Sequence, residues 1–228
     1  MAHAPGGEWS GFWREIRHLH WGAVDDEILT AVADVLGWGP ERTLLEIGGG
    51  RGLHSKRLWE SGRAGAVTIY DLAPETRVLV ERAGIAWTGG LPDEPTDADR
   101  YEIVWSNGVV EHYEGEPRQT IVDDHFRRSR DWVVIVAPRA NWQRRLFRPR
   151  TGVPDQWEYS VPEMRERLAE GARRVWGGPP ASLGARSFCP LFAVRHIPDG
   201  VYPIVDKLAG WALPDGLVLG WARRSASP

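Results

Sequence analysis

The stretch Thr43–Gly52, TLLEIGGGRG, decides the fold. Its first five residues have the composition of a short buried strand, and glycines follow at alternate positions: Gly48, Gly50 and Gly52. Because glycine adopts backbone angles that other residues avoid, such a turn is tight and leaves its backbone open to a ligand. The next helix, predicted at Leu53–Glu60, offers free N–H groups to a carboxylate or phosphate at its start. The stretch therefore predicts a strand–turn–helix unit with a ligand at the turn.

A carboxylate follows the next predicted strand, where it can reach a ligand bound at the turn. The second predicted strand, 66–70, ends at Asp71, 25 residues after Glu46. In an open α/β sheet this position places a carboxylate to accept hydrogen bonds from ribose hydroxyls. The dinucleotide pattern G-x-G-x-x-G fails, because its third glycine position is Leu53. The alternatives are a sharp turn without a ligand and, for Asp71, a surface helix cap.

Strand-like and helix-like segments alternate on both sides of this unit. Further strands are predicted at 85–88, 101–105 and 132–137, and helices at 9–20, 25–36, 74–83, 117–128 and 161–169. We expect loop at 89–100 and mostly loop at 177–203, with a last strand at 216–223 that closes the sheet. Alternation of this kind implies a doubly wound, mostly parallel sheet. The predicted class is α/β: a Rossmann-like sheet with helices on both faces and an antiparallel C-terminal strand.

Composition narrows the functional class. The chain has 228 residues, 42% hydrophobic and 26% charged, with a net charge of −3, which does not suggest a polyanion-binding protein. Its single cysteine, Cys189, excludes an internal disulfide and a multi-cysteine zinc site. The N-terminal stretch lacks a signal-peptide pattern, and no apolar run approaches the roughly 18 residues of a membrane span. We expect a cytoplasmic protein without a membrane span; the sequence does not set the oligomeric state.

Three ordered motifs resemble the class I S-adenosyl-L-methionine (SAM)-dependent methyltransferases. The pattern E-x-G-x-G-x-G, from Glu46 to Gly52, is similar to their motif I. Val67–Asp71 resembles their second strand with its ribose-binding acid. Tyr101–His112 resembles their fourth strand and the segment after it. The resemblance covers about residues 40–140, extends loosely to Arg174, and implies SAM as the cofactor.

The resemblance implies a role for each matching residue. The turn glycines should let the backbone approach the methionine part of SAM, and Glu46 should orient that part by hydrogen bonding. Asp71 should bind the ribose hydroxyls, with Leu72 packed on the adenine and Asn107 beside the reactive methyl group. The expected cofactor-binding residues are Glu46, Gly48, Gly49, Gly50, Gly52, Asp71, Leu72, Gly90, Leu91 and Asn107.

The sequence departs from the family's pattern after the third strand. Many members have an acid there that accepts the adenine amino group, whereas this chain has Gly89-Gly90-Leu91-Pro92 and no acid until Asp93. We expect backbone groups of Gly90 or Leu91 to contact the adenine instead.

Methyl transfer to oxygen or nitrogen needs an aligned, deprotonated acceptor and the exclusion of water. Glu111-His112 follows the fourth strand directly. An imidazole has an unperturbed pKa of about 6.5, so His112 is the candidate general base; the alternative is that the pair braces the following helix. His18, His20 and Trp21 lie in a segment that often folds over the cofactor in relatives. His20 is therefore a second catalytic candidate, with packing as the alternative.

A metal-assisted reaction is not expected. The ubiquinone-type O-methyltransferases and the small-RNA 2′-O-methyltransferases carry E-x-x-E-H at this place, where both glutamates and the histidine can bind a divalent ion. Here the second glutamate is Glu111 and the histidine is His112, but Gly108 occupies the position of the first glutamate. One ligand is lost, so we expect no metal site and no RNA 2′-O-methylation.

A basic run lies beyond the fifth strand. Its arginines are interleaved with Trp142 and Phe147: Arg139, Arg144, Arg145, Arg148 and Arg150. It could bind an acidic group of the acceptor or a nucleic-acid strand, but a solvated surface is the simpler interpretation, and the negative net charge argues against nucleic acid.

These features predict one domain with four parts. An N-terminal helical lid spans 1–38, a SAM-binding core 39–138, a basic insertion 139–160, and the C-terminal part of the sheet with the acceptor side 161–228. The predicted function is SAM-dependent, metal-independent methylation of an oxygen or nitrogen of a small-molecule acceptor. The alternatives are methylation of protein or RNA, and a catalytically silent SAM-binding subunit.

Overall fold

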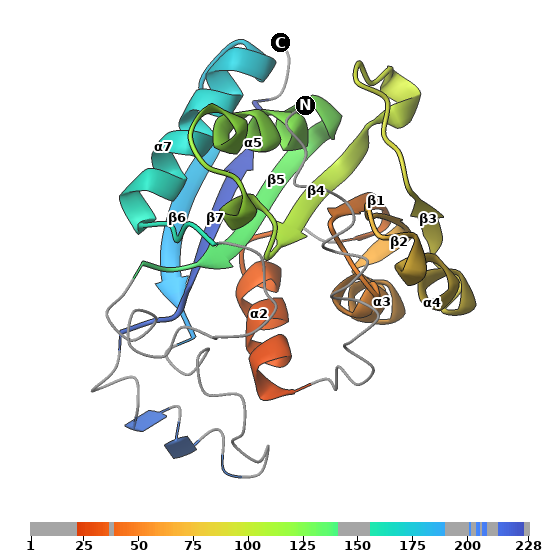
Figure 1. Cartoon of the computed structure of the whole chain (residues 1–228). Coiled ribbons are helices and arrows are strands. Elements are labelled where there is room, and N and C mark those ends of the chain that lie inside the picture. The colour runs from red at the N-terminus through yellow and green to blue at the C-terminus, as the bar shows by residue number, and fades with distance from the viewer. Residues whose placement is uncertain are drawn as a thin grey trace.

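A seven-stranded sheet organises the chain (Figure 1). The structure, a computed structural model, describes residues 22–36, 39–140, 156–189 and 214–225, with positions 201, 204, 205, 207 and 208. The strand order is β3-β2-β1-β4-β5-β7-β6. The five parallel strands are β1 (Gly39–Ile47), β2 (Ala64–Tyr70), β3 (Ala86–Thr88), β4 (Tyr101–Asn107) and β5 (Ser129–Pro138). The antiparallel strand β7 (Leu217–Arg223) lies between β5 and β6 (Ser182–Phe188).

Helices cover both faces of the sheet (Figure 1). Buried side chains of α2 and α3 join one apolar core with one face, and those of α5 and α7 join a second core with the other. The α-helices are α2 (Ala23–Ala33), α3 (Leu53–Glu60), α4 (Arg77–Arg82), α5 (Glu116–Arg128) and α7 (Val161–Gly171). Shorter helical turns are η1 (Pro74–Thr76), η2 (Asp97–Asp99), η3 (Val110–His112) and η4 (Ala172–Trp176), the last a π-helix. None of the helices in the described ranges has both the length and the apolar character that crossing a membrane requires.

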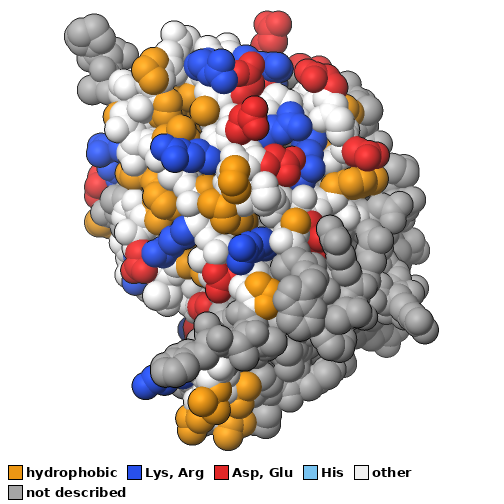
Figure 2. Space-filling model, turned by 90° about the vertical axis from the view of Figure 1, so that its left-hand side faces the viewer, with side chains coloured by type: hydrophobic (Ala, Val, Ile, Leu, Met, Phe, Trp, Pro, Cys, Tyr) orange, Lys and Arg blue, Asp and Glu red, His pale blue; other side chains and the backbone are white. Residues whose placement is uncertain are grey.

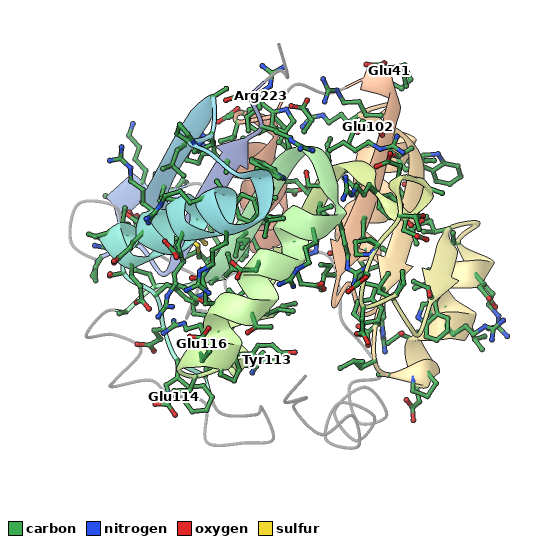
Figure 3. The ribbon with its side chains drawn as sticks, turned by 90° about the horizontal axis from the view of Figure 1, so that it is seen from above. Glu41, Glu102, Tyr113, Glu114, Glu116 and Arg223 are labelled. Atoms are coloured by element: carbon green, nitrogen blue, oxygen red, sulfur yellow. The ribbon has the colours of Figure 1, made fainter. Side chains whose placement is uncertain are left out.

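The register of the parallel strands brings three loops to one edge. Ile47 of β1 pairs with Tyr70 of β2, so the glycine turn and Asp71 follow at the same level. Glu46 pairs with Trp105 of β4, two residues before Asn107. Carboxyl ends of parallel strands are where open α/β sheets bind ligands. Figure 3 shows Tyr113, Glu114 and Glu116 at the opposite end of the sheet from Glu41, Glu102 and Arg223.

The predicted doubly wound α/β class is confirmed, including an antiparallel C-terminal strand. Two details were wrong. The segment 177–203, predicted as mostly loop, contains the unpredicted strand β6 at the edge of the sheet, and the last strand therefore lies inside the sheet rather than closing it. The sequence of β6, SLGARSF, has small and polar residues and is mostly half-buried, so it lacks the apolar alternation that marks a strand. Its regular pairing with β7 makes it a strand.

Packing of α7 on the sheet depends on Gly220 of β7. A Cβ atom at this position would lie 2.5 Å from Met164 Cγ and 2.7 Å from Leu168 Cδ1, both on α7. Both side chains are fully buried, so neither has open space to move into.

We predict that Gly220→Val lowers the free energy of unfolding by about 1–3 kcal/mol, the usual range for overpacking a core. Urea unfolding followed by circular dichroism measures it. Gly178→Ala is the control, because a Cβ at Gly178 would have no heavy atom within 4 Å. Equal unfolding midpoints for the two variants would contradict the tight packing of α7 on β7.

Candidate functional site

The glycine turn after β1 has the backbone geometry that its sequence predicts. Gly48, Gly50 and Gly52 have φ angles of 65°, 53° and 67°, in the region that favours glycine. Gly52 is the N-cap of α3, and no side chain caps that helix. The turn therefore leads into a helix N-terminus that no side chain caps. The free N–H groups there can bind a carboxylate.

Asp71 binds the turn to the end of β2. Its Oδ2 accepts the Gly50 N–H at 2.7 Å, and its Oδ1 accepts the Ala73 N–H at 2.8 Å. The side chain is buried, and this burial raises the pKa of Asp71, although the two backbone hydrogen bonds act in the opposite direction. Each carboxylate oxygen retains a lone pair after these bonds, so Asp71 can accept further hydrogen bonds in a fixed orientation.

Glu46 is a buried acid next to the same turn. Burial raises the pKa of Glu46 from 4.5 to about 7, against the lowering effects of His54 and of hydrogen bonds from Ser55. Its Oε2 is buried and has no hydrogen-bond partner in the described part of the chain. A Cβ atom at Gly49 would lie 3.0 Å from the Glu46 Cδ, so the glycine lets the backbone pass over the carboxylate. A buried acceptor without a partner carries a desolvation cost. A hydrogen bond from a ligand donor would remove that cost.

The segment after β4 lies against the turn. A Cβ at Gly48 would meet Val109 Cγ2 at 2.5 Å, so the two loops are in contact. Asn107 ends β4 and is half-buried at this edge. Glu111 and His112 follow in η3, with 3.9 Å between Glu111 Oε1 and His112 Nε2, and both side chains are at most 5% exposed. The structure thus brings the predicted base and its neighbouring acid to the edge that carries the turn.

On the β3 side, Gly90 and Leu91, which are predicted to contact the adenine, lie in a loop that Thr88 holds. The Gly90 N–H donates to Thr88 Oγ1, and that hydroxyl donates to the Gly90 carbonyl. The Gly90 amide is therefore occupied, and its carbonyl keeps one lone pair. Leu91 packs against the buried side chains of Leu45, Ile47 and Val104, while Leu72 is half-buried beside Asp71. Thr88, which sequence reasoning missed, fixes this loop.

The segment 156–160 is hydrogen-bonded to η3. The Trp157 N–H donates to the Glu111 carbonyl at 2.7 Å. Arg118 of α5 donates to the carbonyls of Trp157 and Glu158, pairs with Glu163, and stacks on the Tyr159 ring at 3.5 Å. Burial raises the pKa of Tyr159 to about 12. Sequence reasoning missed both Arg118 and Tyr159, because only the tertiary structure joins α5 to this segment.

Other predicted residues fall outside the described part of the chain. These are His18, His20 and Trp21, and, in the basic run, Trp142, Arg144, Arg145, Phe147, Arg148 and Arg150. Arg139 is described: it is half-buried and its Nη1 lies 3.9 Å from Asp215. Within the described ranges, no group of three or more His, Cys, Asp or Glu side chains is placed to hold a metal ion.

These residues fit the cofactor that the motifs imply. SAM presents a carboxylate, an ammonium group and two ribose hydroxyls. The uncapped start of α3 suits the carboxylate, the open oxygen of Glu46 suits the ammonium group, and Asp71 suits the hydroxyls. The negative side chains therefore suit the ammonium and hydroxyl donors of SAM, and the positive end of the helix dipole suits its carboxylate.

Comparison with solved structures places the fold in a known class. A Haloferax volcanii protein solved in complex with the Trm112 methyltransferase activator aligns with a TM-score of 0.63 and 16% identity over 97% of this chain and 96% of its own. The 1,6-didemethyltoxoflavin-N1-methyltransferase of Burkholderia thailandensis, with S-adenosylhomocysteine (SAH) bound, aligns with a TM-score of 0.62 and 17% identity. The alignment covers 97% of this chain and 87% of that protein. The geranyl diphosphate C-methyltransferase of Streptomyces coelicolor A3(2) aligns with a TM-score of 0.63 and 14% identity. The alignment covers 99% of this chain and 100% of that protein.

The chain has the fold of class I SAM-dependent methyltransferases. No family model and no curated protein sequence matches it. At these identities the likeness concerns the fold alone.

Asp71→Ala should weaken SAH binding by about 1.5–3 kcal/mol, because it removes charged acceptors for two hydroxyls. It should also lower the melting temperature, since the Gly50 and Ala73 amides lose their acceptor. Calorimetry and thermal melting measure the two effects, with the exposed Asp93→Ala as control. An unchanged SAH affinity would assign ribose binding to another residue.

Glu46 should make stability depend on pH. Its pKa is about 7 in the folded protein and about 4.5 in an unfolded chain, so between these values the folded state holds a proton that the unfolded state has released. The free energy of unfolding therefore falls as pH rises through this window, by on the order of 3 kcal/mol. Glu46→Gln should match the wild type at pH 5 and be more stable at pH 8 in urea unfolding. The exposed Glu60→Gln is the control; a constant offset between Glu46→Gln and wild type at both pH values would refute this role.

Proposed function

We propose that the chain is a SAM-dependent methyltransferase that methylates an oxygen or nitrogen of a small-molecule acceptor without a metal ion. One observation carries the proposal: Asp71 and the open oxygen of Glu46 flank a glycine turn on a methyltransferase fold. Dinucleotide-binding sites share the fold's layout but need glycine where Leu53 stands. We further propose that the protein acts in the cytoplasm.

SAM supplies an electrophilic methyl group on a sulfonium, and the protein's part is to position and to deprotonate. The glycine turn, Glu46 and Asp71 hold the methionine and ribose parts, and Asn107 ends its strand beside them. His112 takes the proton from an acceptor hydroxyl or ammonium group at Nε2 or Nδ1. Glu111, whose Oε1 lies 3.9 Å from His112 Nε2, stabilises the imidazolium that results.

The fold does not determine which atom of the acceptor is methylated. The Burkholderia protein is named for a nitrogen and the Streptomyces protein for a carbon, and the latter was solved with Mg²⁺ and geranyl diphosphate. Oxygen or nitrogen is favoured here because Glu111-His112 supplies an acid–base pair that a positioned heteroatom acceptor needs. Metal independence is proposed because Gly108 replaces the first glutamate of the E-x-x-E-H ligand set.

A macromolecular acceptor and a silent subunit are the rivals. The Haloferax protein was solved with an activator protein, so assembly with a partner protein is a rival for this chain. Against an RNA substrate, acidic and basic side chains are interspersed on the face in Figure 2, and the two arginines of η4 are paired with Glu170. Against a silent subunit, the turn, Asp71 and Asn107 are all intact.

The test has two stages. Calorimetry with SAH and with NADH should show binding at micromolar scale for SAH alone. Radiolabelled SAM is then incubated with panels of small hydroxyl and amine compounds, RNA and cell protein, with and without EDTA. NADH binding in place of SAH would overturn the proposal, and label in RNA or protein alone would select the rival acceptor. Loss of transfer in EDTA, restored by Mg²⁺, would refute metal independence.

With an acceptor from that screen, His112→Ala should lower turnover about 10²–10⁴-fold, the range that general bases supply. SAH affinity should change little, and the acid limb of the pH–rate profile should disappear. A bracing role predicts instead a lower melting temperature and a rate that follows the folded fraction. Near-normal turnover in a stable variant would remove His112 as the base.

A further inference from the structure

The buried Arg118 of α5 binds segment 156–160 at several points. Its Nη2 donates to the Trp157 carbonyl at 2.7 Å and to the Glu158 carbonyl at 3.1 Å. Its Nη1 lies 3.0 Å from Glu163 Oε1, in the first turn of α7. One side chain of α5 therefore joins the backbone of the segment to the helix that follows it.

The position of Arg118 is unusual for a cation. It lies in the first turn of α5, where the helix dipole favours negative rather than positive groups. A buried guanidinium also loses its hydration, so it needs several partners within the protein. Two backbone carbonyls, the Glu163 carboxylate and the face of the Tyr159 ring supply them. The planar guanidinium can bond and stack at the same time, which an ammonium group cannot do.

The segment in turn binds the residues on the acceptor side. The Trp157 N–H donates to the Glu111 carbonyl at 2.7 Å, and Glu111 lies in η3 directly before His112. The Tyr159 N–H donates to the Pro138 carbonyl at 3.0 Å, at the end of β5. Hydrogen bonds therefore run from the arginine of α5, through the backbone of the segment, to the turn that carries the predicted base.

We propose that Arg118 is a positioning residue for methyl transfer: it holds segment 156–160 against η3, and the segment fixes Glu111 and His112 relative to the bound cofactor. This rests on the proposed function. Because η3 is a single short 3-10 turn, contacts from outside set its position. A general base must lie within hydrogen-bond reach of the proton it takes, and a displacement of about 1 Å can slow a reaction about 100-fold.

The first test needs neither cofactor nor acceptor. Arg118→Met keeps an unbranched apolar stem but removes the charge and the donors. Hydrogen exchange followed by NMR should show the Trp157 and Tyr159 amides exchanging about tenfold faster or more, because the segment opens more often. The Gly50 amide, which Asp71 holds, should not change. Unchanged exchange at Trp157 and Tyr159 would overturn the inference.

Two further variants complete this test. Arg118→Lys keeps a cation for Glu163, but an ammonium group cannot reproduce the planar contacts, so the exchange rates should be intermediate. It also carries the test if melting shows that Arg118→Met does not fold. Arg174→Met is the matched control, because this arginine also pairs with the first turn of α5, through Glu116 at 3.5 Å. Its other partners lie on α5 and α7 rather than on the segment, so exchange in the segment should not change.

The second test uses methyl transfer to an acceptor from the screen. Arg118→Met should lower kcat about 10–100-fold, while SAH affinity stays within about twofold because the cofactor residues are intact. In the His112→Ala background the same change should lower kcat by less than about twofold, since both residues act through one base. Arg118→Lys should recover part of the rate. Rate losses that multiply in the double variant would mark a general structural role and overturn the inference.

The outcomes separate this inference from the proposed function. Absence of SAH binding and of methyl transfer in the wild type would overturn the proposed function, and with it a role of Arg118 in transfer. Wild-type transfer together with unchanged amide exchange in both Arg118 variants would overturn this inference alone.

Discussion

The site depends on the hydrogen bonds that Asp71 accepts from the Gly50 and Ala73 amides. They join the turn after β1 to the end of β2, and they hold a buried carboxylate in one orientation. A turn of three glycines with positive φ has many conformations open to it in isolation. The carboxylate selects one of them, and Val109 closes over it from the segment after β4. The glycine turn, the Asp71 carboxylate proposed to bind the ribose, and the segment proposed to face the methyl acceptor are therefore parts of one arrangement.

A second constraint is the burial of charge around this turn. Glu46 is 3% exposed, and burial raises its pKa to about 7, so keeping it ionised costs stability near neutral pH. A neutral residue would make a more stable fold at that position. The ammonium group of SAM, in the proposed binding mode, would offset this cost, and proteins accept such local instability at functional sites.

Much of this could be predicted from local sequence. The glycine spacing fixes the turn, and the apolar runs before it and before Asp71 fix two parallel strands, because both signals are carried by neighbouring residues. Edge strand β6 could not be predicted, since its small and polar residues become a strand only through pairing with β7. The Asp25–His54 and Arg118–Tyr159 contacts span 29 and 41 residues of sequence, and only the packed fold brings these partners together. The departure at Gly90 was visible, but the bond to Thr88 that occupies its amide was not.

The most direct test of the account is a crystal structure of the chain with SAH bound. The account predicts the ribose hydroxyls within hydrogen-bond distance of Asp71, the ammonium group against Glu46, and the carboxylate at the start of α3. It also predicts that the Gly50–Asp71 bond is kept. SAH bound away from the glycine turn, or bound there with its ribose clear of Asp71, would contradict the central claim.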